Sequence, residues 1–337
     1  MLIKIKKSAH AGDIQMIRQL LNRHNLGHRV INAGTETIIG VEANPSEEIA
    51  RELNALSAVE SAMPIATPYK LASLAAHPEK TVIRIGNIEI GGEAIVLMAG
   101  PCAIESQEQL EAVAEGLKGT GVSVLRASAY KPRTSPYSFQ GMGEEGLKLH
   151  VSAKAKHGLL IETEVMDVRD VALVAAHVDI IRIGARNMQN FDLLKEVGKC
   201  GKPVILKRGM SSTIEEWLMS AEYIIAHGNP DVILCERGIR TFENATRSTL
   251  DLSSIPVLKR LTHLPVIVDP SHAAGRKDLI PALSAAAIAA GADGLLVEVH
   301  ANPKKAKCDG KQALLPIEWA ELVCLLKKVA LAMGRSI

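Results

Sequence analysis

A dense group of cations follows one mostly apolar segment of the chain. Residues 126–135 read Arg-Ala-Ser-Ala-Tyr-Lys-Pro-Arg-Thr-Ser, and they come directly after residues 122–125. A strand that leaves a buried sheet points its last side chains into whatever site the end of the sheet forms. Arginine offers a planar fork for phosphate or carboxylate, whereas lysine acts as a point charge. The segment therefore predicts an anion-binding site, with a solvated basic loop as the alternative.

Similar cations follow other apolar runs, so the pattern extends along the chain. The predicted anion-binding cations are Arg126, Lys131, Arg133, Arg186, Lys207 and Arg237. If they converge on one site, they would suit small substrates that carry two phosphates, or a phosphate and a carboxylate. Ordinary ion pairs with Glu162, Glu164 and Glu236 are the alternative explanation.

A second set of residues combines side chains that bind transition metals. The set comprises Cys102, His272, Glu298 and Asp309. A thiolate, an imidazole and two carboxylates form a mixed site for a transition metal, not an oxygen-only site for calcium. Because Cys308 and His300 lie close by in the sequence, the assignment of a ligand could shift by a residue or two.

Two other chemistries could use the same side chains. Cys102 and His272 could act as a nucleophile and its base, although neighbouring carboxylates would raise the pKa of the thiol. Lys131 or Lys207 could form a Schiff base with a carbonyl substrate, because neighbouring arginines would lower the pKa of the lysine. The residues alone leave both alternatives open.

The elements that must position these residues follow a regular rhythm. Eight short aliphatic runs alternate with helical patterns, in residues 95–100, 122–127, 159–165, 179–185, 203–209, 232–238, 265–270 and 294–300. Because the runs are continuously apolar, we expect parallel strands that helices cover on both faces. Eight such units predict a TIM (β/α)8 barrel, whose chemistry lies at the C-terminal strand ends. A doubly wound sheet is the alternative, although it usually needs fewer strands.

The beginning of the chain has a different pattern. Strand-like runs occupy residues 2–6, 29–43 (two runs around Gly34) and 59–66, and helical patterns occupy residues 11–25 and the segment that follows Ser46 as the expected N-cap. This βαββαβ order predicts a ferredoxin-like α+β domain. We assign residues 1–70 to this ACT-like domain, 71–80 to a linker, and 81–337 to the barrel with an N-terminal hairpin.

Composition excludes several classes of function. The chain has 337 residues, and its 39 Lys and Arg against 37 Asp and Glu give a net charge of +2. This balance argues against nucleic-acid or membrane-surface binding as the main role. We find no apolar run that would span a bilayer and no secretory signal. Five cysteines without CxxC spacing indicate free thiols and a cytoplasmic location.

The strand-end motifs resemble those of one enzyme family. They read GPCAIES (100–106), KPRTS (131–135), IGARN (183–187), LKRG (206–209), DPSH (269–272), and VEVH followed by DG (297–310). Over residues 81–330 the chain resembles the 3-deoxy-D-arabino-heptulosonate 7-phosphate (DAHP) synthases. The form with an N-terminal ferredoxin-like regulatory domain is similar over the whole chain. The related 3-deoxy-octulosonate 8-phosphate (KDO8P) synthases share GPC-x-x-E and the barrel, but have Asn where this chain has Pro132.

The resemblance implies that phosphoenolpyruvate condenses with erythrose 4-phosphate and releases phosphate, as the first step of the shikimate pathway. It implies that a divalent metal such as Mn²⁺ is held by Cys102, His272, Glu298 and Asp309. Phosphoenolpyruvate would be held by Arg126, Lys131, Arg186, Lys207 and Arg237. The phosphate of erythrose 4-phosphate would be held by Arg133, Thr134 and Ser135. The candidate proton carriers are Lys131 and His272, with Glu162 and Glu164 as open alternatives.

The resemblance also implies regulation and assembly. We expect residues 1–70 to mediate feedback inhibition by phenylalanine or tyrosine, in a homotetramer. One alternative function is a KDO8P synthase-like condensation with arabinose 5-phosphate. The other is a non-catalytic anion-binding barrel, which we would expect to lack a metal ligand or a phosphate-binding cation, and the sequence lacks none.

Overall fold

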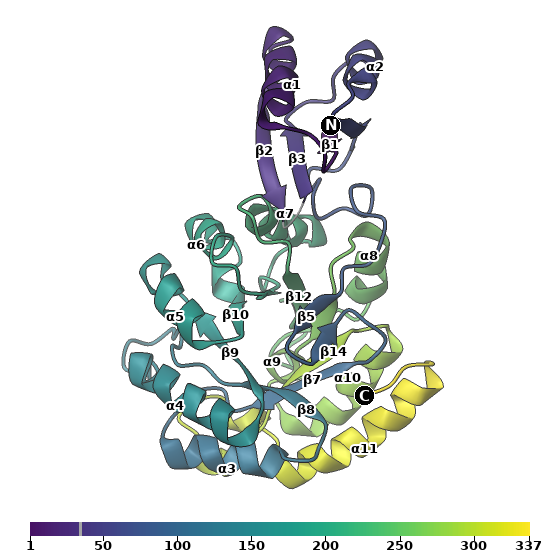
Figure 1. Cartoon of the computed structure of the whole chain (residues 1–337). Helices are drawn as coiled ribbons and strands as arrows, with labels where there is room; N and C mark the ends of the chain where they lie inside the picture. Colours follow the sequence, from purple (N-terminus) through teal and green to yellow (C-terminus); the bar gives the residue numbers. More distant parts are fainter. Residues whose placement is uncertain (34–35) are drawn as a thin grey trace.

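A small N-terminal domain and a larger barrel make up the computed structural model, which describes residues 1–33 and 36–337 (Figure 1). The turn predicted at Gly34 lies outside the described residues. Among those that are described, no helix is long and apolar enough to cross a membrane.

The N-terminal domain has the predicted ferredoxin-like order. Its elements are β1 (Leu2–Ile5), α1 (Ala11–Arg23), β2 (His28–Ala33), β3 (Glu36–Val41), α2 (Glu47–Ala55) and β4 (Val59–Met63). The antiparallel strands lie in the order β2-β3-β1-β4. Ser46 caps α2, because its side chain accepts a hydrogen bond from the backbone N–H of Ile49.

The second domain is a closed barrel of eight parallel strands, which confirms the predicted fold class and excludes the doubly wound sheet. Its strands are β7 (Val96–Gly100), β8 (Val122–Arg126), β9 (Leu160–Val165), β10 (Ile180–Ile183), β11 (Val204–Lys207), β12 (Val232–Glu236), β13 (Val266–Val268) and β14 (Gly294–Glu298). Each lies within one of the eight predicted runs.

Helices surround the barrel and cover its outer face (Figure 1). They are α3 (Gln107–Leu117), α4 (Gly143–His157), α5 (Val171–His177), α6 (Phe191–Val197), α7 (Ile214–Ile225), α8 (Ser254–Leu261), α9 (Pro270–Ala274), α10 (Ile280–Ala289) and α11 (Pro316–Ala332). Strand residues alternate between two apolar clusters. On β7, Leu97 and Ala99 pack in the cluster that includes the helices, whereas Val96 and Met98 pack in a second, inner cluster.

A hairpin closes the N-terminal end of the barrel. Its strands β5 (Ile83–Ile85) and β6 (Ile88–Ile90) contribute four isoleucines to the inner cluster, together with strand residues such as Val96 and Ile267. The N–H of Thr81, just before the hairpin, donates to the carbonyl of His263, which precedes β13. Because apolar side chains fill this end, polar side chains inside the barrel gather at the opposite end.

The N-terminal domain joins the barrel near α7. The backbone N–H groups of Leu71 and Ala72 each donate to the carboxylate of Glu222 at 2.9 Å. His263 contacts the carbonyl oxygen of Leu71 through Nε2 at 2.8 Å. Leu2 and other residues of the small sheet pack in the same apolar cluster as the barrel helices. The small domain is therefore attached at the side and N-terminal end of the barrel, away from the strand ends that carry the predicted site.

Candidate active site and metal centre

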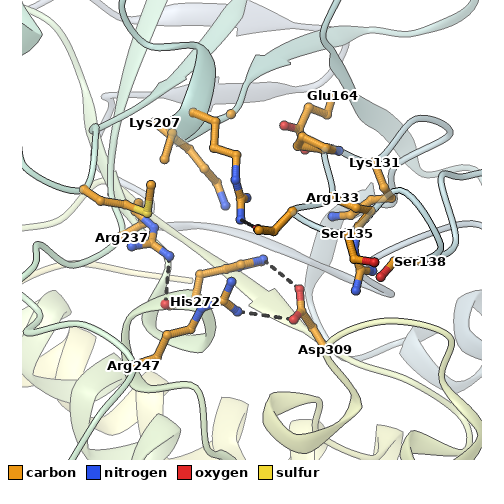
Figure 2. A pocket seen from close by; sticks show the side chains of 16 residues that line it. Lys131, Arg133, Ser135, Ser138, Glu164, Lys207, Arg237, Arg247, His272 and Asp309 are labelled. Atoms are coloured by element: carbon orange, nitrogen blue, oxygen red, sulfur yellow. Dashed lines mark hydrogen bonds and ion pairs between the residues drawn. The ribbon is translucent and has the colours of Figure 1, made fainter. Parts of the chain in front are cut away.

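A polar cavity opens at the C-terminal ends of the barrel strands. It has a volume of about 310 Å³. Nine of the predicted site residues line it: Lys131, Arg133, Thr134, Ser135, Arg186, Lys207, Arg237, His272 and Asp309. Figure 2 shows basic side chains around the cavity, with His272 and Asp309 facing each other. The structure thus brings together most of the cations that the sequence separates.

The four predicted metal ligands form a compact group beside this cavity. One ligand atom from each of Cys102, His272, Glu298 and Asp309 lies within 4.8 Å of the others. Nε2 of His272 lies 3.2 Å from Oε1 of Glu298 and 3.8 Å from Oδ2 of Asp309. Sγ of Cys102 lies 3.2 Å from the same Asp309 oxygen.

This donor set fits a divalent transition metal. Two carboxylates and an imidazole lone pair that face one another repel unless a cation or a proton lies between them. The mixture of sulfur, nitrogen and oxygen donors suits a transition metal better than calcium or magnesium. The residues present therefore match the metal that the sequence predicts.

Local backbone geometry positions two of these ligands. Gly100, at the end of β7, has a φ of 153°, and a Cβ atom there would lie 2.2 Å from the carbonyl oxygen of Arg126 on β8. This close approach fixes where the chain turns toward Cys102. Asp309 has a left-handed φ of 52°, a conformation that aspartate tolerates better than most residues. It lies in the loop after β14, and this loop returns Asp309 to the mouth of the barrel.

Electrostatics disfavour Cys102 as a nucleophile and Lys131 as a Schiff-base lysine. A hydrogen bond with Cys308, burial and the nearby Glu298 carboxylate all raise the pKa of the Cys102 thiol, so it is a poor free nucleophile. Burial lowers the pKa of Lys131, but nearby acidic groups, the Glu164 carboxylate among them, outweigh it and raise the pKa. A lysine that stays protonated is a poor Schiff-base former and a good anion-binding group.

The carboxyl group of Asp309, a predicted metal ligand, stays ionised. Burial alone would raise the pKa of its carboxyl group, but His272, Arg247 and Lys131 hold the pKa well below its usual range. Nη1 of Arg247 lies 3.2 Å from Oδ1 of Asp309. A carboxylate that is charged at neutral pH is ready to bind a cation.

Arg126 lies deeper than the other predicted cations. Its side chain is 1% exposed and does not line the cavity. Nη1 of Arg126 lies 3.0 Å from Oε1 of Glu298, and Nε lies 3.8 Å from Oε1 of Glu162. Arg126 is the last residue of β8, and it is therefore placed beside Glu298, a predicted metal ligand, beneath the cavity. Its role in substrate binding stays a prediction.

Ion pairing explains the buried glutamates better than it explains the cavity cations. Glu162 pairs with Arg182 at 2.8 Å, and Glu236 pairs with Arg208 at 2.9 Å. Neither arginine was assigned to the site from the sequence. Among the described residues, no carboxylate oxygen lies within the 4 Å of a salt bridge from Arg133, Arg186 or Arg237. These three cations are therefore not paired with a carboxylate of the described residues, and their role in anion binding stays a prediction.

Sequence reasoning missed three residues of the site. Arg247 lines the cavity from the long loop between β12 and α8, outside any strand-end motif. Gln312 donates from Nε2 to Oε2 of Glu298 at 2.6 Å and accepts from Arg247 at 3.2 Å. Asp269, directly after β13, contacts both His272 and Lys207. Only its place in the Asp-Pro-Ser-His motif could have pointed to it.

Two family descriptions match the chain. The DAHP synthetase I family matches residues 72–334, and the DAHP synthase ferredoxin-like domain matches residues 1–67. The chain belongs to the DAHP synthase family. As a member, it is a transferase that forms a carbon–carbon bond, and its reaction belongs to the shikimate pathway.

Relatives with known names agree with this assignment. A phospho-2-dehydro-3-deoxyheptonate aldolase of Thermotoga maritima is 48% identical over 334 residues, which cover 99% of each chain. A 2-dehydro-3-deoxyphosphooctonate aldolase of Geobacter sulfurreducens is 33% identical over 266 residues, which cover 73% of this chain and 96% of the relative. The former matches both domains of this DAHP synthase, whereas the latter matches about three quarters of it.

Solved structures extend the match to three dimensions. The crystal structure of DAHP synthase from Thermotoga maritima has a TM-score of 0.80 and 47% identity, and the match covers 99% of this chain and 98% of that chain. A truncated form of the synthase from the same organism has a TM-score of 0.75 and 50% identity, and covers 80% of this chain and 98% of that chain. The predicted fold class is thus found in a synthase that is similar over the full length.

We expect Gly100→Ala to damage the active-site end of the barrel. The added methyl group would meet the carbonyl of Arg126, which cannot move without breaking the β7–β8 pairing. The free energy of unfolding should fall by about 2 kcal/mol or more, in the range for overpacked cores. Gly119→Ala is the control, because Gly119 also has a positive φ of 72° but has nothing within 4 Å of a new Cβ. Equal thermal unfolding midpoints of the two variants would contradict this reading.

Proposed function

We propose that this DAHP synthase condenses phosphoenolpyruvate with erythrose 4-phosphate and uses a divalent metal such as Mn²⁺. The observation that carries the proposal is the group of cations around one 310 Å³ cavity, with the metal-ligand group at its edge. Two small polyanions repel each other in water. A site that surrounds both with fixed cations removes that repulsion and orients the reacting atoms.

The cations divide between the two substrates. Phosphoenolpyruvate would be held by Arg126, Lys131, Arg186, Lys207 and Arg237. The phosphate of erythrose 4-phosphate would be held by Arg133, Thr134 and Ser135. Support comes from the contact of Arg186 with Thr134 Oγ1 at 3.4 Å, which places the two groups side by side.

The chemistry joins C3 of phosphoenolpyruvate to the aldehyde carbon, and the aldehyde oxygen takes up a proton. Water then adds at C2 and loses one proton, which balances the proton taken up by the aldehyde oxygen. The C2–O bond to phosphate breaks, and the remaining proton of the C2 hydroxyl passes to the departing phosphate, which leaves a ketone and inorganic phosphate. The metal, held by Cys102, His272, Glu298 and Asp309, would supply Lewis-acid polarisation of the aldehyde oxygen. Lys131 is the proton donor that we favour, because it lines the cavity and its ammonium group carries protons that it can donate. His272 has both ring nitrogens engaged, by Asp269 and by the ligand group, so we assign it to the metal.

Arabinose 5-phosphate is the competing acceptor, since the relatives at 33% identity are named 2-dehydro-3-deoxyphosphooctonate aldolases. Pro132 favours the shorter sugar, because its ring fixes φ and biases Lys131 toward an extended backbone. Both residues line the cavity, in the same loop as Arg133. We therefore assign the wall of the acceptor pocket to this loop.

We expect erythrose 4-phosphate to give the higher kcat/KM of the two acceptors. Phosphate release from phosphoenolpyruvate should be measured with each sugar phosphate in turn. Pro132→Asn should reduce the difference in kcat/KM between the two sugar phosphates. It introduces the side-chain amide that the KDO8P synthases have at this position, and it frees the backbone of the loop. A higher kcat/KM with arabinose 5-phosphate in the wild-type enzyme would show the proposal to be wrong.

We also expect strict metal dependence. Chelation should abolish activity, and Mn²⁺ or another divalent ion should restore it. Cys102→Ala should fold but bind the metal more weakly. Loss of a residue that only hydrogen-bonds to a metal ligand lowers metal affinity by about 10- to 100-fold, and loss of a ligand itself should cost at least as much. Cys324→Ala is the control, because Cys324 is exposed and lies on α11. Full activity of the chelated enzyme would remove the metal from the mechanism.

Residues 1–70 are proposed to regulate the barrel by binding phenylalanine or tyrosine, with 71–80 as linker. None of the proposed catalytic, metal or substrate residues lies in this domain. A homotetramer and a cytoplasmic location belong to the same proposal. Exposed apolar side chains on α11, Ile317 and Leu331 among them, offer a surface for assembly.

An enzyme that starts at Ala72 should remain active and lose inhibition. The truncated Thermotoga maritima structure supports the expectation that such a barrel folds. Inhibition requires that the effector bind one domain arrangement more tightly than another, so its removal should abolish the response. Rates of the full and truncated chains should be compared with and without each amino acid. Equal inhibition of both, or no response of the full chain, would refute this role.

A further inference from the structure

One buried carboxylate touches both halves of the site. Asp269 follows β13 and is 0% exposed. Its Oδ2 accepts a hydrogen bond from Nδ1 of His272 at 2.7 Å and forms an ion pair with Nζ of Lys207. Its Oδ1 accepts the backbone N–H of His272 at 2.9 Å. A single side chain thus connects a proposed metal ligand with a cation proposed for phosphoenolpyruvate.

The bond to Nδ1 decides which nitrogen of His272 can bind a cation. A carboxylate at Nδ1 requires the proton there, so Nε2 keeps its lone pair. That nitrogen faces Glu298 and Asp309, within the metal-ligand group. The backbone bond to Oδ1 also fixes the start of α9, so the ring cannot turn away independently of Asp269.

The ion pair with Lys207 has a second consequence. The ammonium group is 6% exposed with the rest of its side chain, yet Lys207 lines the cavity. Since the long lysine side chain loses much rotational freedom when it is held, a buried partner orients it before substrate arrives. Asp269 does not line the cavity itself.

We propose that Asp269 is a positioning residue that holds His272 in the metal-binding tautomer and Lys207 in its substrate-binding orientation. The metal and phosphoenolpyruvate would thereby be bound at fixed positions relative to each other. The inference rests on the proposed function, because it takes His272 as a metal ligand and Lys207 as a substrate cation. It goes beyond that function because it assigns one residue, Asp269, to the orientation of both His272 and Lys207. If Asp269 only stabilised the fold, the hydrogen bond from the backbone N–H of His272, which caps α9, would be sufficient.

Asp269→Asn separates these roles. Asparagine caps helices as well as aspartate does, so α9 should be retained. Its amide can donate to Nδ1 of His272, which would move the ring proton to Nε2 and block the metal site. Calorimetric titration of Mn²⁺ into the chelator-treated enzyme should show a loss of about 10- to 100-fold in affinity. At saturating Mn²⁺, KM for phosphoenolpyruvate should rise, while KM for erythrose 4-phosphate should stay unchanged.

Asp293→Asn is the matched control. Asp293 is also a buried carboxylate, pairs with Lys259, and accepts the N–H of Val266 at 2.8 Å at the start of β13. It should lower the thermal unfolding midpoint and leave Mn²⁺ affinity and both KM values unchanged. A similar loss of Mn²⁺ affinity in both variants would overturn the proposal, because general destabilisation would explain it.

A measurement on the wild-type enzyme covers the case in which Asp269→Asn does not fold. Nitrogen-15 NMR of labelled histidines, with His272 assigned by His272→Gln, should show the Nδ1-protonated tautomer in the metal-free enzyme. Protonation at Nε2 would overturn the inference, as would wild-type Mn²⁺ affinity and KM in Asp269→Asn. If the wild-type enzyme itself binds no divalent ion, the proposed metal role fails first and the inference fails with it.

Discussion

The site depends on the neutralisation of carboxylates that are buried at the open end of the barrel. Glu162, Glu298 and Asp269 are each at most 1% exposed, and a lone charge there would cost several kcal/mol. Arg126, Arg182 and Lys207 lie within salt-bridge distance of these carboxylates. Because the hairpin fills the other end with isoleucine, the charged side chains can meet only beneath the cavity. The cations that remain at the mouth are then available for substrates.

The same charge balance bears on the proposed role of Cys102 as a metal ligand. With Cys308 and Glu298 nearby, the pKa of Cys102 is raised, so the metal-free thiol stays protonated and donates to Asp309 at 3.2 Å. A divalent cation held by Cys102, His272, Glu298 and Asp309 would reverse that preference, because a coordinated thiol loses its proton. The Glu298 carboxylate, which helps to keep the Cys102 thiol protonated, is therefore also one of the proposed metal ligands.

The fold was predictable because its signal is local and repeated. Each continuous apolar run contains one barrel strand. Every predicted metal ligand ends a strand, follows one closely or lies in the loop after β14. Contacts between segments that are far apart in the chain produce no local or repeated pattern in the sequence. The depth of Arg126 follows from which way the last side chain of β8 points, and Arg247 reaches Asp309 from a loop 62 residues away in sequence. Gln312 beneath Glu298 likewise depends on the closed barrel and not on any local pattern.

The attachment of the small domain gives regulation a physical route. Leu71 and Ala72 are held by Glu222 on α7, and the indole N–H of Trp217 on the same helix donates to the carbonyl of Leu206 at 3.1 Å. Leu206 precedes Lys207, the cation that Asp269 orients. An effector that favours one domain arrangement would therefore act on α7 before it reached the cavity, and its coupling could not exceed its difference in affinity between the arrangements. The barrel core resists gradual deformation, so such a shift should move α7 as a unit against β11.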